Sequence, residues 1–86
     1  MEDSWQNIKT TAYFREQVLR KRPYVKAPWC LDIIQKALHK EIQIDGRIRY
    51  WGFVEETQKY LRVVTLSDGT LHNAFFDRNF KGDSIV

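Results

Sequence analysis

Two Asp-Gly pairs, Asp45-Gly46 and Asp68-Gly69, each lie between segments in which apolar and polar residues alternate. Alternation with a period of two is typical of a strand with one buried face, and Asp-Gly is a strong signal for the tight turn of a β-hairpin. The chain is therefore predicted to form two hairpins in succession. The first strand is expected to contain Ile42 and Ile44, and the other three to span residues 47–54, 60–66 and 71–78.

A polar loop over residues 55–59 joins the two hairpins, so we expect the strands to pair in chain order as an antiparallel meander. A two-residue loop at Asp68-Gly69 fixes which side chains share a face in the second hairpin. One face, expected to meet the helices, carries Leu61, Val63, Thr65, Ala74 and Phe76. The other face carries Tyr60, Arg62, Val64, Asn73, Phe75 and Asp77.

The first hairpin has two candidate registers. A two-residue loop would place Ile44 opposite Arg47. A three-residue loop would pair Ile44 with Ile48 and Ile42 with Tyr50. The second alternative is favoured because it keeps the apolar side chains together on one face.

Two helices are predicted ahead of the strands. Thr10 and Thr11 can cap the first, in which Phe14 and Val18 lie four residues apart and so share one face. Pro23 ends this helix, because the residue before a proline is disfavoured in the helical conformation.

Pro28 suits the first turn of a second helix, where its missing N–H costs no hydrogen bond. Residues 29–40 carry apolar side chains at helical spacing, namely Leu31, Ile33, Ile34, Ala37 and Leu38. The predicted fold class is α+β, with two N-terminal helices packed on one face of a four-stranded antiparallel meander. Residues 1–9 are expected to form an N-terminal arm, 10–80 a single domain and 81–86 a C-terminal tail.

The composition is that of one small globular domain: 86 residues, 14% aromatic and with a net charge of +3. A single cysteine, Cys30, excludes an internal disulfide and favours a buried thiol in a reducing compartment. The acidic start and the short apolar runs argue against a signal peptide and a membrane span. We therefore expect a soluble, cytoplasmic protein. No metal or cofactor is expected, since the cysteine and the histidines lack zinc spacing and the glycines form no phosphate loop.

Two groups of basic residues are candidates for binding. The first follows the first predicted helix and comprises Arg15, Arg20, Lys21, Arg22 and Lys26, with Tyr24 nearby. It is interpreted mainly as a solvated helix end, where positive charge complements the helix dipole. The second comprises Arg47, Arg49 and Arg62 on the strands, with Tyr50 and Trp51 between them. Cations beside aromatic rings on an open sheet face predict a surface for single-stranded nucleic acid, whereas cross-strand ion pairs are the structural alternative. Asn73 and Asp77 complete the candidate binding residues.

The last predicted strand carries the groups that could do chemistry. His72 could act as a general acid or base, with Glu55 or Asp77 as its partner. Arg62 or Arg78 could stabilise charge on a phosphate. In the favoured register, however, His72 and Arg78 point to one face, and Arg62, Asn73 and Asp77 to the other. This separation favours a structural role for the strand.

Three segments of the predicted sheet, residues 45–52, 60–64 and 71–78, resemble a family of short bacterial domains of unknown function. The order of helices followed by an antiparallel sheet is also similar in topology to the barnase and RelE-like ribonucleases, many of which are toxins. That likeness implies a metal-independent ribonuclease, with His72 or Glu55 as acid or base and with Arg62 and Arg78 as phosphate stabilisers. A non-catalytic module that binds nucleic acid or a protein is the favoured hypothesis. A protein that only joins a larger complex through Trp5, Trp29 or Trp51 is a third.

Overall fold

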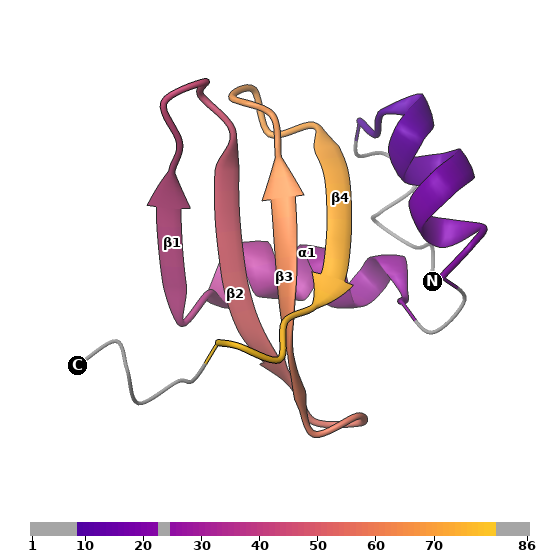
Figure 1. Ribbon diagram of the computed structural model, residues 1–86, viewed down its shortest axis with the longest axis vertical. Helices are drawn as coiled ribbons and strands as arrows, with labels where there is room; N and C mark the ends of the chain where they lie inside the picture. The colour runs from indigo at the N-terminus through magenta and orange to yellow at the C-terminus, as the bar shows by residue number, and fades with distance from the viewer. Residues whose placement is uncertain (1–8, 23–24, 81–86) are drawn as a thin grey trace.

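The computed structural model describes residues 9–22 and 25–80. Its elements are η2 (Phe14–Leu19), α1 (Ala27–Lys36), β1 (His39–Ile42), β2 (Ile48–Val54), β3 (Lys59–Thr65) and β4 (Leu71–Phe76). The strands form one antiparallel sheet in the order β1-β2-β3-β4. α1 crosses one face of this sheet, and η2 lies beside β4 at its edge (Figure 1). The α+β class and the four-stranded meander are thus confirmed, and no helix of the described segments is long and apolar enough to span a membrane.

The expected arm and tail fall on residues 1–8 and 81–86, which lie outside the described part of the chain together with Pro23 and Tyr24. Lys9 is described, and its carbonyl oxygen accepts a hydrogen bond of 2.9 Å from the N–H of Leu71. The N–H of Thr11 donates to the Leu71 carbonyl oxygen at 2.9 Å. Residues 9–11 therefore run parallel to β4 and pair with its outer edge.

The prediction of two N-terminal helices was wrong, because α1 is the only helix of more than six residues in the described part of the chain. The first helical segment is a short π-helix, η2. The expected cap is present, since the Thr11 hydroxyl oxygen accepts a hydrogen bond from the N–H of Phe14 at 3.0 Å. Within η2 only Phe14 and Val18 are buried. Tertiary packing supplies most of the stability of a helix in a protein, and two buried side chains support only a short segment.

α1 begins with Pro28 in its first turn, as predicted, but ends at Lys36 rather than at residue 40. The chain leaves the helix there because it begins to pair with β2. The N–H of Leu38 donates to the Trp51 carbonyl oxygen at 2.8 Å. Leu38, expected on the apolar face of the helix, is instead 51% exposed. Ala27, Cys30 and Ile33 are the residues of α1 that are buried.

The register of the second hairpin was predicted correctly over most of its length. Leu61 pairs with Phe76, Val63 with Ala74, and Val64 with Asn73. Leu61, Val63, Thr65 and Ala74 are fully buried on the face that α1 covers. The opposite face of the sheet, which no described helix covers, is called the open face below.

Neither register predicted for the first hairpin is observed, since Ile42 pairs with Ile48. The loop does have three residues, but they are Ile44, Asp45 and Gly46. The Gly46 N–H donates to the Gln43 carbonyl oxygen at 3.0 Å, and Gly46 has a φ of +91°. This is the turn in which a glycine in the left-handed region occupies the third loop position. The glycine therefore fixes the register, and Ile42 and Ile44 remain 70% and 108% exposed.

Candidate functional site

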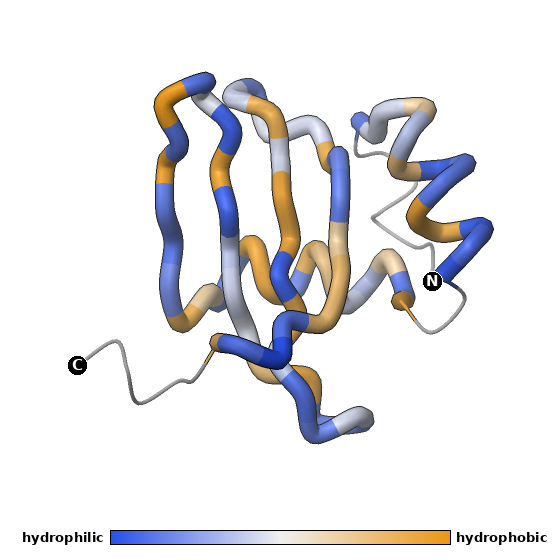
Figure 2. Tube along the Cα trace, viewed as in Figure 1, coloured by the Kyte–Doolittle hydropathy of each residue, from blue (hydrophilic) through white to orange (hydrophobic). Residues whose placement is uncertain are grey.

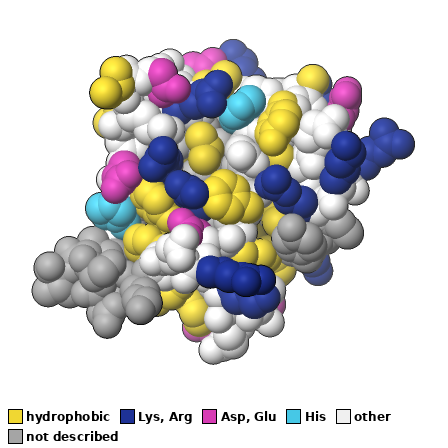
Figure 3. Space-filling view, viewed as in Figure 1, with side chains coloured by type: hydrophobic (Ala, Val, Ile, Leu, Met, Phe, Trp, Pro, Cys, Tyr) yellow, Lys and Arg dark blue, Asp and Glu magenta, His cyan; other side chains and the backbone are white. Residues whose placement is uncertain are grey.

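Side chains from three strands meet in a hollow on the open face of the sheet. Cross-strand pairing places Arg49 beside Val64 and Asn73, and places Trp51 beside Arg62 and Phe75. We call this cavity of about 340 Å³ the arginine hollow. It is lined by Tyr13, Gln43, Arg47, Arg49, Arg62, Val64, His72, Asn73 and Phe75. Figure 3 shows this face of the molecule, with Lys and Arg side chains spread among apolar ones.

A β-bulge brings His72 into the arginine hollow. The register shifts between Val64 and Thr65, so that Thr65 pairs with Leu71 and His72 is left without a partner strand residue. Strict alternation had separated His72 from Arg62 and Asn73. That expectation was wrong, because a bulge inserts one extra residue and reorients the side chains around it. All three residues line the same hollow.

Each arginine of the hollow lies near one carboxylate. Arg47 Nε is 3.7 Å from Asp45 Oδ2, Arg49 Nη1 is 3.7 Å from Glu41 Oε1, and Arg62 Nε is 3.6 Å from Asp77 Oδ2. These are the cross-strand and local ion pairs of the structural alternative. None of these contacts is short enough to be a hydrogen bond, and within the described residues the three guanidinium groups donate no hydrogen bond. Their donors therefore remain available to an anion.

Arg62 is the most buried of the three arginines and is held between aromatic rings. Its guanidinium carbon lies 4.3 Å from the ring centroid of Phe75 and 5.6 Å from that of Trp51. Asp77 Oδ2 also accepts a hydrogen bond from the Trp51 indole N–H at 3.0 Å. Arg62 Nε is buried and has no hydrogen-bond partner among the described residues. The position of this guanidinium group is thus fixed by stacking rather than by hydrogen bonds.

The N-terminal segment supplies contacts to the hollow that the sequence did not predict. The Tyr13 ring lies 5.1 Å from that of His72, and the Thr11 hydroxyl is 3.1 Å from His72 Nδ1. Arg22 Nη1 donates to Asn73 Oδ1 at 3.2 Å and to the Ala74 carbonyl oxygen at 3.0 Å. Arg22 is therefore the member of the first basic group that bonds to residues of the sheet. No local pattern could indicate these contacts, which join segments more than fifty residues apart in the sequence.

The two aromatic residues predicted between the arginines lie on different faces. Tyr50 pairs with Val63 on the covered face and belongs to the hydrophobic core, so it does not lie on the open face with the arginines. Successive residues of a strand point to opposite faces of the sheet, so Tyr50 and Arg49 cannot share a face. Trp51 lies on the open face, but Phe80 stacks on its ring at 5.3 Å, and Trp51 is only 5% exposed.

Two of the four catalytic candidates converge and two do not. His72 and Arg62 line the arginine hollow, whereas Arg78 lines a separate cavity beyond the end of β4. Glu55 is exposed in the turn between β2 and β3 and lines neither cavity. Asp77, the other partner proposed for His72, lines the cavity that contains Arg78, so neither proposed partner lines the hollow.

Burial shifts the pKa of groups in and near the hollow. Desolvation, and then the positive charge of Arg47, lower the pKa of His72 below 6.5. For Asp77, burial opposes ionisation, but hydrogen bonds from Trp51 and from the Asn79 N–H outweigh it and lower its pKa. His72 is therefore mostly neutral at neutral pH, and Asp77 is ionised.

No three His, Cys, Asp or Glu side chains of the described residues are placed to hold a metal ion together. Cys30 is fully buried in the core, as expected, and desolvation raises the pKa of its thiol to about 12. A thiol with so high a pKa is not nucleophilic at neutral pH. The hollow accordingly offers arginine and amide N–H donors, the kind of group that can bind an anion.

Comparison of the chain with protein-family models, with curated proteins and with solved structures finds no match. The functional argument therefore depends on the geometry of the site.

Proposed function

We propose that the chain is a non-catalytic binding module that holds single-stranded RNA on the open face of the sheet, with phosphate groups in the arginine hollow. The observation that carries this proposal is the convergence of Arg47, Arg49 and Arg62 on one cavity, with no hydrogen bond from their guanidinium groups to described residues. Guanidinium groups match phosphate geometry and bind it through paired hydrogen bonds. The amide of Asn73 and the imidazole of His72 add neutral groups to the same hollow.

A single strand suits the hollow better than a duplex does. The cavity, of about 340 Å³, is at the lower end of the range of about 300–1,000 Å³ for ligand sites and cannot hold a helix. Half-buried aromatic rings, such as Phe75, lie at its border. A cationic groove beside aromatic rings is typical of proteins that bind unpaired nucleotides.

The proposal is tested by the salt dependence of binding to a short single-stranded RNA, followed by fluorescence anisotropy. Removing a phosphate contact lowers the slope of log K against log salt by about 0.7 for a single strand. The double variant Arg47→Ala, Arg49→Ala is therefore expected to weaken binding and to lower the slope by about 1.4. Both side chains are solvent-accessible and outside the core, so the variant should remain folded.

The matched control is Lys26→Ala with Lys36→Ala. This pair removes the same charge from exposed positions beside and on α1, remote from the open face. Its slope should equal that of the unmodified chain. An equal loss of slope in both double variants would show that the attraction is non-specific and would contradict a site in the hollow. Binding of an acidic peptide but not of RNA would replace this proposal by a protein partner.

The ribonuclease hypothesis stays as a second candidate because the β-bulge puts His72 in the same hollow as Arg62. A neutral imidazole beside bound phosphate could accept a proton from a ribose 2′-hydroxyl. The same RNA is examined by gel after incubation with the protein. Cleavage that is lost in His72→Gln would favour the enzyme, whereas intact RNA would support the binding module.

A further inference from the structure

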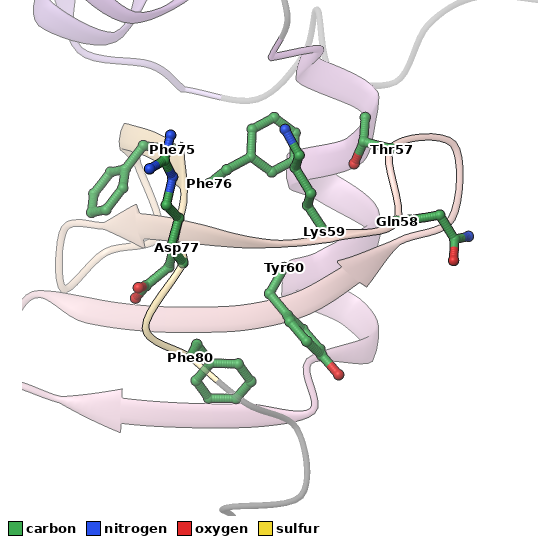
Figure 4. A pocket seen from close by; sticks show the side chains of 9 residues that line it. Thr57, Gln58, Lys59, Tyr60, Phe75, Phe76, Asp77 and Phe80 are labelled. Carbon is green, nitrogen blue, oxygen red and sulfur yellow. The ribbon is translucent and has the colours of Figure 1, made fainter.

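A second cavity, of about 710 Å³, lies beyond the end of β4, next to the arginine hollow. We call it the aromatic pocket. It is lined by Thr57, Gln58, Lys59, Tyr60, Phe75, Phe76, Asp77, Arg78 and Phe80. Figure 4 shows these side chains, which come from the turn after β2, from β3, and from β4 and the segment that follows it.

Four of the lining side chains are aromatic, and packing fixes their rings. Phe80 stacks on Trp51 at 5.3 Å with an interplanar angle of 12°, and it meets Tyr60 edge-on at 5.2 Å. Phe75 is covered on one side by the guanidinium group of Arg62 at 4.3 Å. Tyr60, Phe75, Phe76 and Phe80 are each half-buried. Rings fixed in this way lose little conformational freedom when a planar ligand stacks on them.

Cations lie at the rim of the aromatic pocket. Lys59 and Arg78 are exposed, and neither forms a salt bridge within the described residues. Gln58 beside them has a φ of +57°, a left-handed conformation that a residue with a side chain rarely adopts. Lys59 Nζ lies 5.7 Å from the centroid of the Phe76 ring. The pocket thus combines half-buried aromatic rings with positive charge, as the binding of a base and its flanking phosphate requires.

The two cavities adjoin at Phe75, which lines both. Arg62 lies over this ring and also lines the arginine hollow, so a ligand can pass from one cavity to the other along the open face. We propose that the aromatic pocket takes a nucleobase of the same RNA strand whose phosphates the arginine hollow holds. This inference rests on the proposed function and adds to it a base site, because every nucleobase has a π-face that can stack on aromatic side chains.

The test compares a short single-stranded RNA with an abasic ribose-phosphate strand of the same length. Tyr60→Leu and Phe80→Leu keep apolar bulk but remove the stacking surface. Each is expected to lower affinity for the RNA by about 5- to 150-fold, which corresponds to one stacked base. Affinity for the abasic strand and the salt slope should not change, because no phosphate contact is lost.

Leu38→Ala is the control for a general loss of apolar surface, since Leu38 is 51% exposed and lines neither cavity. It should leave both affinities unchanged. A measurement on the unmodified chain makes the test independent of the folding of any variant. On addition of RNA, but not of the abasic strand, the NMR signals of the Tyr60 and Phe80 rings should shift upfield, as stacking requires.

The outcomes separate this inference from the proposed function. Equal affinity for RNA and the abasic strand, with a slope that still depends on Arg47 and Arg49, would overturn the base site and leave the RNA-binding proposal intact. Equal loss of affinity in Leu38→Ala and Phe80→Leu would also overturn the base site. Absence of salt-dependent binding by both strands would overturn the proposed function and this inference with it.

Discussion

At the scale of single residues, Thr65 is a buried position whose polar group is not satisfied. It is fully buried on the covered face of β3, and its hydroxyl has no hydrogen-bond partner within the described residues. A buried hydroxyl that loses its hydrogen bonds to water costs about 1–3 kcal/mol. Thr65→Val replaces this group by a methyl of similar size, and we expect it to raise the free energy of unfolding by about 1 kcal/mol. Urea unfolding with an unchanged m-value measures the difference.

Thr70→Val is the control for this prediction. Thr70 is also buried, but its hydroxyl lies close enough to the Asp68 carboxylate to lower the pKa of that group. Thr70→Val should therefore lower the free energy of unfolding of the chain, whereas Thr65→Val should raise it. A lower free energy of unfolding in both variants would show that the Thr65 hydroxyl has a hydrogen-bond partner.

At the scale of elements, the approach of α1 to β2 depends on a glycine. A Cβ atom added at Gly52 would lie 2.7 Å from Ile33 Cγ1 and 3.2 Å from Cγ2, closer than atoms can pack. Ile33 is β-branched and its side chain cannot turn away cheaply in a helix. We expect Gly52→Ala to lower the free energy of unfolding by about 1–3 kcal/mol, the usual cost of overpacking.

A double-mutant cycle identifies the cause of that loss. Ile33→Ala by itself should cost about 2–5 kcal/mol, because it opens a cavity beneath the helix. In the Ile33→Ala background the added methyl group at Gly52 has room, so Gly52→Ala should cost less than it does in the unmodified chain. An unchanged cost, measured by urea unfolding, would mean that the clash lies elsewhere than between α1 and β2.

Elements set by local turn chemistry were predictable from the sequence, whereas the bounds of α1 and β1, which depend on pairing with β2, were not. Both Asp-Gly turns were identified, because Gly46 and Gly69 supply the positive φ that such turns need. The end of α1 was missed, because the hydrogen bond from Leu38 to Trp51 decides it and no helix-stop signal in the sequence marks it. β1 was misplaced for a related reason. It is a short, largely polar edge strand (Figure 2), so apolar alternation could not locate it.

The candidate site was likewise predictable only in part. Arg49, Arg62 and Asn73 share a face because of the pleat, which sequence alternation reports directly. The position of His72 depends on a bulge, and those of Tyr13 and Arg22 on the docking of the N-terminal segment against β4. A bulge of one residue leaves the sequence pattern almost unchanged. These three residues could therefore be assigned only once the tertiary structure was known.

At the scale of the whole molecule, acidification should destabilise the chain in two steps. The pKa of His72 is lower in the folded chain than its usual 6.5, so protonation favours the unfolded state as pH falls through about 6.5 toward the folded value. The pKa values of Asp68 and Asp77 are also lowered, so their contribution is present above about pH 4 and is lost as pH falls further. Unfolding by urea at a series of pH values should show both steps, and His72→Gln should remove only the first. If the first step persisted in His72→Gln, the assignment of that step to His72 would be contradicted.

Affinity for RNA should change with pH in the opposite direction to stability. Desolvation and Arg47 keep His72 neutral in the free chain, and Tyr13 and Thr11 are its other close neighbours. A bound phosphate would offset the charge of Arg47 and raise the pKa of His72, so binding takes up a proton. Affinity is therefore expected to rise as pH falls from about 8 to about 5.5, the range in which histidine titrates.

His72→Gln should abolish this rise, while His39→Gln, which changes a histidine outside the hollow, should retain it. Anisotropy titrations at constant ionic strength make the measurement, with the folded fraction checked at each pH. A rise that depends on His39 instead would move the phosphate site toward β1 and away from the bulge. If the rise in affinity were lost in His72→Gln alone, the extra residue of the bulge in β4 would be linked to RNA binding, because the bulge is what brings His72 to the hollow.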